Sequence, residues 1–247
     1  MIRPRPEISC VVPAFEQPDL LERCLRSIAA QRGVAAEVIV SDDSRDGAVR
    51  ARVEALGLSA VRCADGARTG NPVDNWNLGL EQARANVCVL IHHDEYLLDP
   101  TYLRRAVDSL ADQSVAAVIG GTVVNGVERP SRFALARRIG HALGRPAWIL
   151  PSLNWIGPTA AFVFRRGPLF DPALVQLVDV AFYRQVLAGG RAAMLGGACV
   201  GSLGHHGAQI TAAIDPRALA RAELPHLAGG GELALHRAVL AARGWTR

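Results

Sequence analysis

The sequence predicts an α/β fold in which a mostly parallel sheet is flanked by helices. Apolar runs of strand length alternate with amphipathic helical patterns through the first half of the chain, and this alternation is typical of parallel sheets with helical crossovers. Polar residues follow several of these apolar runs, at the place where the carboxyl ends of parallel strands line a ligand crevice. We therefore expect one layered domain with its chemistry at one edge of the sheet.

Seven apolar runs are predicted strands, at residues 8–12, 37–41, 61–63, 87–91, 115–124, 160–164 and 192–200. Helical patterns lie at residues 20–28, 48–56, 75–84 and 101–111, within 171–188, and at 216–224 and 232–242. Pro13 should stop the first strand, because proline has no N–H for a sheet ladder. Asp19 should cap the helix that follows. Between residues 125 and 151 the pattern loosens into an arginine-rich stretch, which we interpret as an exposed segment.

The composition is that of a globular protein. Half of the 247 residues are hydrophobic and 20% are charged, which excludes a disordered or fibrous chain. The net charge of +4 is too small to indicate nucleic acid as a partner. The five cysteines form no C-x-x-C pair, so neither a disulfide framework nor a zinc knuckle is expected. With no signal-like N-terminus and no apolar run of membrane-spanning length, we expect a cytoplasmic protein without a transmembrane segment.

The most informative segment is the fourth predicted strand, which leads directly into His92, His93, Asp94 and Glu95. Four groups able to bind a metal or a proton are costly to place at the end of a buried strand unless they bind something. The alternative is a polar loop in which Asp94 or Glu95 caps the next helix. Asp99, directly before Pro100, suits that capping role better.

A second acidic pair, Asp42 and Asp43, follows the second predicted strand. Carboxylates at this place in a layered sheet can accept hydrogen bonds from ribose hydroxyls or from a base N–H. The alternative is a local turn in which Asp42 or Ser44 bonds to nearby backbone N–H groups. The chain contains neither G-x-G-x-x-G nor G-x-x-x-x-G-K-[ST], so the common dinucleotide and P-loop interpretations lose their main support.

Taken together, these blocks resemble the inverting family 2 nucleotide-sugar glycosyltransferases with the GT-A fold. The matching blocks are ISCVVPAF at 8–15 with LLERCLRSI at 20–28, VIVSDDSRDG at 38–47, and NWNLGLEQA at 75–83 continuing to HHDE at 92–95. The resemblance covers about residues 7–110, and order and spacing agree across it. It implies a GT-A fold for residues 1–247, with a nucleotide-binding half (about 7–110), an acceptor-binding half (about 111–212) and a C-terminal helical extension (about 213–247).

The resemblance also implies roles for individual residues. The implied nucleotide-binding residues are Pro13, Ala14, Glu16, Asp42, Asp43, Asn71 and Asn75. Asp94 matches the last position of the family's D-x-D metal motif, but His92 replaces the first carboxylate and gives H-x-D. A neutral imidazole is an acceptable ligand for Mn²⁺ and a less typical one for Mg²⁺. His93 and Glu95 would contact the sugar or the diphosphate, and the alternative for Glu95 is to support the metal ligands without touching the substrate. His205 or His206 would complete the site for a divalent cation.

The second half matches more loosely, through NWIGPTAAFVFRR at 154–166 and LVDVAFYR at 177–184. By the same resemblance, Asp179 is the base that activates the acceptor. The alternative is that Asp179 caps a helix over 180–187, and Asp171 is a reserve candidate for the base. For His205 and His206 the alternative is an exposed pair without a role.

The implied function is transfer of a sugar, with inversion, from a nucleotide diphosphate-sugar to a saccharide or lipid-linked acceptor in polysaccharide or glycoconjugate biosynthesis. The protein would be cytoplasmic or peripheral at the inner face of the membrane. The C-terminal helices would pack on the sheet or on a second subunit. Two rival hypotheses are a non-catalytic nucleotide-sugar-binding protein of the same fold and a nucleotidyltransferase. Against the latter, no glycine-rich, lysine-bearing loop follows the first strand.

Overall fold

The computed structural model describes residues 5–129, 132–135, 138, 154–203 and 215–242. In this part of the chain nine strands form one sheet in the order β3-β2-β1-β4-β8-β6-β9-β5, with β7 paired to β6. The strands are β1 (Ile8–Ala14), β2 (Ala36–Asp42), β3 (Val61–Asp65), β4 (Val87–Leu90), β5 (Glu95–Leu97), β6 (Val115–Val124), β7 (Val127–Arg129), β8 (Phe162–Arg165) and β9 (Arg191–Ser202). The helices are α1 (Pro18–Ala29), α2 (Ala48–Leu56), α3 (Pro72–Glu81), α4 (Tyr102–Ser109), α6 (Val178–Leu187), α7 (Pro216–Leu227) and α8 (Gly230–Ala242), with a 3₁₀ turn η1 (Thr159–Ala161).

The sheet has a parallel part and a mixed part. Strands β3, β2, β1 and β4 are parallel neighbours, and β6 and β9 form a further parallel pair. β8 lies between β4 and β6 and runs antiparallel to both. This arrangement confirms the predicted α/β class. The sequence did not predict β5 and β7, which are three residues each and pair antiparallel with β9 and β6.

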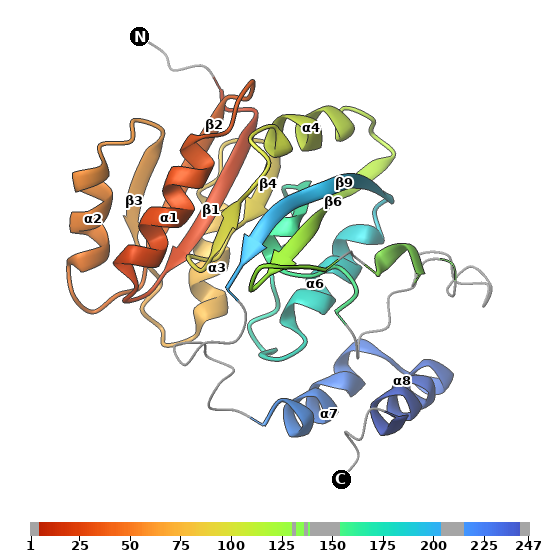
Figure 1. The fold of residues 1–247 in the computed structure, drawn as a ribbon. Helices are drawn as coiled ribbons and strands as arrows, with labels where there is room; N and C mark the ends of the chain where they lie inside the picture. The colour runs from red at the N-terminus through yellow and green to blue at the C-terminus, as the bar shows by residue number, and fades with distance from the viewer. Residues whose placement is uncertain (1–4, 130–131, 136–137, 139–153, 204–214, 243–247) are drawn as a thin grey trace.

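Helices cover both faces of the sheet, and β1 shows why (Figure 1). Alternate side chains of a strand point to opposite faces. Ile8, Cys10 and Val12 therefore join a core cluster with α1 and α4, whereas Val11 joins the cluster on the other face with α3 and α6. At Gly79 in α3 an added Cβ would lie 2.5 Å from Val11 Cγ1, so this glycine lets α3 approach the sheet closely.

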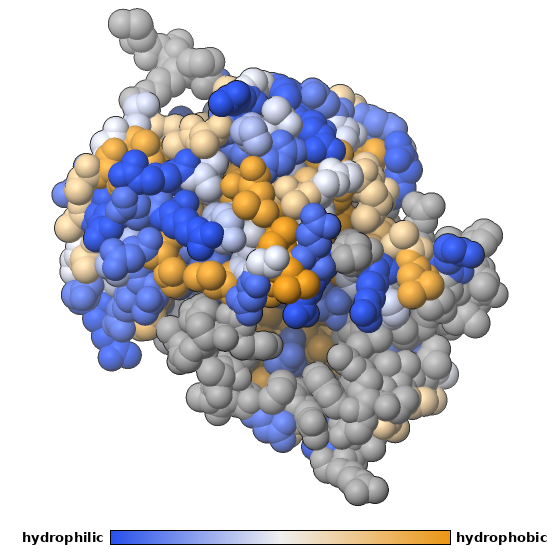
Figure 2. Space-filling model, in the orientation of Figure 1, coloured by the Kyte–Doolittle hydropathy of each residue, from blue (hydrophilic) through white to orange (hydrophobic). Residues whose placement is uncertain are grey.

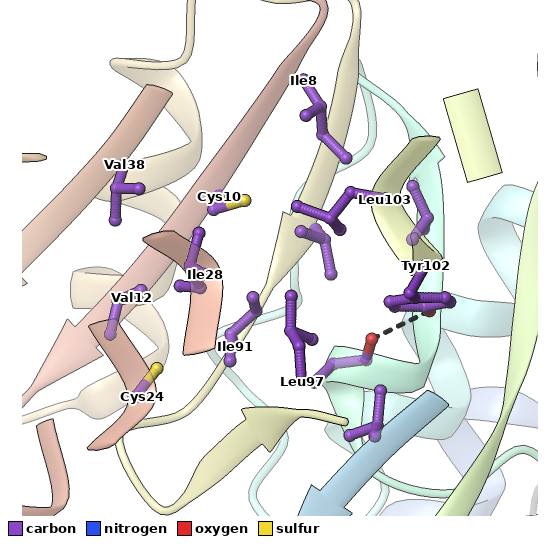
Figure 3. Packing of buried hydrophobic residues seen from close by; sticks show 14 of the residues in the cluster. Ile8, Cys10, Val12, Cys24, Ile28, Val38, Ile91, Leu97, Tyr102 and Leu103 are labelled. Atoms are coloured by element: carbon purple, nitrogen blue, oxygen red, sulfur yellow. Dashed lines mark hydrogen bonds between the residues drawn. The ribbon is translucent and has the colours of Figure 1, made fainter. Parts of the chain in front are cut away.

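The core extends from the parallel part into the mixed part. Figure 3 shows Cys24 and Ile28 of α1 over β1, and Tyr102 of α4 beside Leu103. The Tyr102 hydroxyl donates to the Ala160 carbonyl over 3.0 Å, which satisfies a polar group in this apolar surrounding. On the face shown in Figure 2, hydrophobic residues are interspersed with hydrophilic ones. No helix among the described residues is long and apolar enough to cross a bilayer.

Two predicted boundaries are wrong. Pro13 does not end β1, which continues to Ala14. β4 pairs with β1 only from Ser9 to Val11, so Pro13 lies beyond that ladder and needs no N–H on that side. Asp19 does not cap α1.

The helix begins at Pro18, two residues before the predicted start, and its N-cap is Gln17. The fixed φ and missing N–H of Pro18 suit a first helical position. Asp19 lies in the first turn and forms an ion pair with Arg52 at 2.9 Å.

Candidate functional site

The predicted donor-side residues gather at one edge of the sheet because three parallel strands end there. Ala14 at the end of β1 is paired with Asp42 at the end of β2, and Val11 is paired with Leu90 at the end of β4. The chain beyond β2 stays attached to β1, since Asp43 N donates to the Ala14 carbonyl over 3.0 Å. This edge is the carboxyl end of the parallel strands, where ligands of such sheets bind.

The acidic turn after β2 is held by backbone hydrogen bonds. Asp42 is buried, and its Oδ1 accepts from Ser44 N over 3.0 Å, which is the local turn that the sequence left open. Asp43 is half-buried, and its Oδ1 accepts from Arg68 N over 2.5 Å. Each carboxylate has a second oxygen beyond these bonds, so the turn fixes both carboxylates and leaves them acceptor capacity for a ligand.

The residue after Phe15 joins this turn to β1. Glu16 has a positive φ of 49°, and its N–H donates to Ser44 Oγ over 2.9 Å. Its exposed side chain lies 3.8 Å from Arg45. The end of β1 and the acidic turn therefore form one hydrogen-bonded unit, with Pro13 and Ala14 forming its buried base.

Asn71 and Asn75 have structural roles in the described fold. Asn71 is the N-cap of α3, where its side chain accepts from Val73 N over 3.0 Å and donates to the Pro172 carbonyl over 2.9 Å. Asn75 is buried. Its Oδ1 accepts from Ser41 Oγ over 2.6 Å, and its Nδ2 donates to the Ser41 carbonyl over 3.0 Å. Asn75 therefore fastens α3 to β2, and α3 begins at Pro72 rather than at the predicted residue 75.

The segment after β4 turns tightly and brings its polar groups together. His93 and Asp94 form the turn and are half-buried. Glu95 Oε2 accepts from His92 N over 2.9 Å, and Glu95 N donates to the His92 carbonyl over 2.9 Å. The His92 ring meets the Trp76 ring edge to face, with centroids 4.8 Å apart. Burial lowers the pKa of His92 to about 4, against the opposing effect of Asp94, so its imidazole is neutral near pH 7.

Glu95 lies inside the protein, because it begins β5. Its side chain is 4% exposed, and Oε2 also accepts from Thr159 Oγ1 over 3.1 Å and from Ala160 N over 3.2 Å. Burial raises the pKa of Glu95 to about 8, and the charges of Asp94 and Asp179 act in the same direction. No local pattern predicts the contact with Thr159, because that partner lies 64 residues away.

Asp179 is positioned by the first turn of α6. The N-cap of this helix is Leu177 and has no side-chain capping bond, so the interpretation of Asp179 as the cap is wrong. Its Oδ1 is shielded from solvent and has no hydrogen-bond partner among the described residues. Burial raises the pKa of Asp179 to about 6. Asp171, the reserve candidate, is exposed and accepts from Ala173 N over 2.9 Å in a turn.

Asp179 and Glu95 lie on elements that contact the same short segment although 84 positions separate them. Tyr183, one turn after Asp179 in α6, donates through its hydroxyl to the Gly157 carbonyl over 3.2 Å, and Thr159 donates to Glu95 over 3.1 Å. Burial raises the pKa of both Glu95 and Tyr183, and the charge of Asp179 acts in the same direction on each. Segment 157–159 therefore connects α6, which carries the predicted base, to the start of β5.

Only part of the predicted cation site lies within the described residues. His205 and His206 lie outside the described residues, and within those residues no group of three His, Cys, Asp or Glu side chains is placed to hold a metal ion. His92 and Asp94 supply one neutral imidazole and one carboxylate. This donor pair fits Mn²⁺, which accepts both ligand types, and requires further ligands from outside the pair.

Comparison with known proteins identifies the family. Residues 4–161 match the sequence profile described as Glycosyltransferase like family 2. The chain belongs to this family. The uncharacterized protein MT1568 of Mycobacterium tuberculosis (strain CDC 1551 / Oshkosh) is 30% identical over 208 residues, which cover 74% of this chain and 62% of that protein. The succinoglycan biosynthesis protein ExoO of Rhizobium meliloti (strain 1021) is 32% identical over 103 residues, or 42% of this chain and 29% of ExoO. The chain thus spans less than two thirds of either relative.

Solved structures of glycosyltransferases share the fold. S. aureus TarS superimposes with a TM-score of 0.67 and 17% identity, over 97% of this chain and 44% of TarS. The mannosyltransferase PcManGT from Pyrobaculum calidifontis, solved with GDP-Man and Mn²⁺, gives a TM-score of 0.65 at 20% identity, over 98% of this chain and 76% of that one. S. aureus TarS 1–349 in complex with UDP-GlcNAc gives a TM-score of 0.64 at 18% identity, over 96% of this chain and 71% of that one. The predicted GT-A fold is confirmed.

Proposed function

We propose that the protein transfers a sugar, with inversion, from a nucleotide diphosphate-sugar to an acceptor hydroxyl. The observation that carries this proposal is Asp179, whose Oδ1 is shielded from solvent and has no hydrogen-bond partner among the described residues, and whose pKa burial raises to about 6. A carboxylate oxygen in this state is suited to accept a proton from a substrate hydroxyl. Inversion requires that this base lie across the sugar from the leaving diphosphate.

The donor nucleotide binds at the ends of β1 and β2 in this proposal. Asp43 and the buried Asp42 accept hydrogen bonds from the base and ribose, and Pro13 and Ala14 form the apolar floor. Glu16, held in its unusual backbone conformation by Ser44, borders the same place. The turn is already fixed by protein hydrogen bonds, so nucleotide binding should lose little conformational entropy in ordering it.

A divalent cation is held by Asp94 with the neutral imidazole of His92, and by His205 or His206. When bound, the cation supplies positive charge that offsets the charge developing on the leaving diphosphate. His93 lies in the same turn and contacts the diphosphate or sugar. The edge-to-face contact with Trp76 restricts the orientation of the His92 ring, which supports a fixed ligand geometry.

Glu95 shapes the site from inside in this proposal. Its bonds to His92 N, Thr159 and Ala160 N tie the turn after β4 to η1, between the donor side and the acceptor side. The acceptor is a saccharide or a lipid-linked saccharide. The similarity to ExoO, a succinoglycan biosynthesis protein by name, favours polysaccharide assembly as the setting.

The test is thermal unfolding with UDP, GDP, ADP, CDP and dTDP, each with and without Mn²⁺, for the wild type, Asp94→Asn and a control, Asp108→Asn. Asp108 is exposed on α4 and pairs with Arg104. A ligand that binds only the folded state raises its stability. We expect one nucleotide to stabilise the wild type and the control in a Mn²⁺-dependent way, and Asp94→Asn to lose the Mn²⁺-dependent part.

The H-x-D departure makes a non-catalytic binding protein the second candidate. It predicts stabilisation by a nucleotide that is the same with and without Mn²⁺ and in Asp94→Asn. Release of sugar from the matching donor, measured in the presence of candidate acceptors, separates the two candidates. Absence of any nucleotide effect would overturn both.

A further inference from the structure

A buried carboxylate in the C-terminal helices holds the segment that leads into α6. Glu223 of α7 is 5% exposed. Its two oxygens accept from three consecutive backbone N–H groups: Val175 N over 2.7 Å, Gln176 N over 3.1 and 3.2 Å, and Leu177 N over 2.8 Å. One side chain thus satisfies three donors that lie 46 to 48 residues earlier in the chain.

This contact replaces a cap that α6 lacks. Leu177, the N-cap of the helix, offers no side-chain acceptor, although the start of a helix leaves N–H groups without partners and favours negative charge. Glu223 supplies both the acceptor and the charge from another helix. Because Leu177 is directly followed by Val178 and Asp179, the bonds to Glu223 fix the backbone two residues before the proposed base.

A second connection holds the other end of α6. Arg184, in the last turn of the helix, donates to the Leu227 carbonyl over 2.9 Å and pairs with Glu232 of α8 at 2.9 Å. Between the two polar connections, Leu177 and Leu224 form a small buried cluster against Leu227 and Leu233. Figure 1 shows α7 and α8 beneath α6. The C-terminal helices therefore hold α6 at both ends.

We infer that Glu223 is a positioning residue for Asp179. Through this residue, α7 contributes to the proposed acceptor site. This inference rests on the proposed function. The family profile ends at residue 161, so this contact lies outside the part of the chain that the family match covers. Among the described residues Asp179 Oδ1 has no hydrogen-bond partner, so within this part of the chain the placement of α6 directs that oxygen.

The test compares Glu223→Gln with the matched control Glu232→Gln. Glutamine keeps the size of the side chain, but its NH₂ group meets backbone N–H donors and cannot accept from them. Glu232 is also a carboxylate of the C-terminal helices in contact with α6, but at the other end. The readouts are kcat, KM for the donor, nucleotide binding, and hydrogen exchange of the amides of residues 175–177.

We expect Glu223→Gln to lower kcat about 10- to 100-fold, as a displacement near 1 Å does in oriented catalysis, with donor KM and nucleotide binding within about twofold of wild type. Exchange at residues 175–177 should rise. Glu232→Gln should change kcat by less than about threefold. If Glu223→Gln exposes the whole chain to exchange, Glu223→Asp, which keeps the charge on a shorter side chain, takes its place.

The inference is overturned if exchange at residues 175–177 rises while kcat stays within twofold, or if Glu232→Gln lowers kcat equally. A parallel loss of nucleotide binding would also overturn it, because the effect would then be a general one. The variant Asp179→Asn distinguishes failure of the inference about Glu223 from failure of the proposed function. If that variant transfers sugar at the wild-type rate, the base itself is wrong, whatever Glu223 does.

Discussion

The two sides of the site are held in different ways. On the donor side, the acidic turn, the end of β1 and the turn after β4 are fixed by hydrogen bonds at the ends of neighbouring parallel strands. On the proposed acceptor side, Asp179 Oδ1 has no partner among the described residues, and a carboxylate distant in the sequence holds the helix that directs it. The difference teaches that the proposed donor side is fixed as a binding surface would be, whereas the proposed acceptor side keeps a costly group that suits chemistry.

The largest expected effect is on transfer by Asp179→Asn. A general base contributes about 10²- to 10⁴-fold to a rate, so initial rates with the matching donor should fall by that factor while nucleotide binding is retained. Asp171→Asn, which alters a turn carboxylate on the same side of the chain, should stay within about threefold of wild type. Equal losses in both variants would remove the distinction between the two aspartates.

The pH dependence of transfer should follow the raised pKa of Asp179. The base acts when ionised, so the rate should fall about tenfold per pH unit below pH 6 and level off above it. Among the described residues, the charge of Asp179 contributes to the raised pKa values of Glu95 in β5 and Tyr183 in its own helix, which are due first to burial. A pH–rate profile between 4.5 and 8 measures this, and the residual activity of Asp179→Asn should lack the acidic limb.

The donor side can be disturbed through Gly66, which approaches the acidic turn closely. An added Cβ would lie 2.7 Å from the Asp42 carbonyl and 2.8 Å from Asn75 Oδ1. We expect Gly66→Ala to weaken nucleotide binding about tenfold and to cost about 1–3 kcal/mol of unfolding free energy. Gly196→Ala, where an added Cβ meets nothing within 4 Å, is the control. Calorimetric titration measures the affinity for the nucleotide, and urea unfolding measures the free energy of unfolding. Equal values for Gly66→Ala and Gly196→Ala in both measurements would contradict this prediction.

The smallest expected effect is on the free energy of unfolding. The sign of this change should differ between Asp179, whose pKa is raised, and Asp112, whose pKa is lowered. The pKa of Asp179 is raised from 3.8 to about 6 in the folded protein, so its ionisation destabilises the fold. This cost is absent below about pH 4, where folded and unfolded chains are both protonated, and is complete above about pH 6. Asp179→Asn should therefore stabilise the protein by on the order of 2 kcal/mol at pH 7.5, and by less toward pH 5.

Asp112 provides the opposite case for the same urea measurements. Bonds from Ser114 and Arg191 hold its pKa at about 2, so its ionised form contributes stability that is present above the ordinary pKa and is lost as the pH falls toward 2. Asp112→Asn should thus leave stability at pH 7.5 unchanged or lower it. If Asp179→Asn instead destabilised the protein at pH 7.5, the ionised carboxylate of Asp179 would have hydrogen-bond donors that stabilise it in the folded state.

The sequence predicted the turn after β2 because that contact is local: Asp42 accepts from Ser44 N two residues later. Asp99 accepts from Thr101 N, but the N-cap of α4 is Thr101, so the prediction that Asp99 caps this helix is wrong. The roles of the acidic turn and its neighbours in binding a nucleotide stay a prediction. Strand β5 was missed because three residues carry no readable period, and so Glu95 was not expected inside the protein. The antiparallel direction of β8 depends on partners that lie 43 to 78 residues earlier in the chain, from Ile119 paired with Phe162 to Val87 paired with Arg165, and local patterns do not specify such partners.

The same limit applies to the acceptor side. The helical patterns of α7 and α8 were predicted, but the choice between the sheet and a second subunit as their partner was open. They pack on α6. Glu223 was one acidic residue among others on an amphipathic pattern, and nothing in its neighbours marked it as the acceptor for Val175 to Leu177. The roles of Asp94, His92, His205 and His206 as cation ligands stay a prediction.

The contact between Glu223 and the backbone before α6 also has a consequence for synthesis, because it determines when the parts of the site become available in the growing chain. Synthesis delivers the chain from its N-terminus, and all four strands of the parallel part of the sheet have been made once residue 90 has emerged. The acceptor for the backbone before α6 arrives only with residue 223. A nascent chain would thus contain the strands of the proposed donor side long before it contained the residue that orients Asp179, and the proposed transfer activity would require nearly the whole of the described chain.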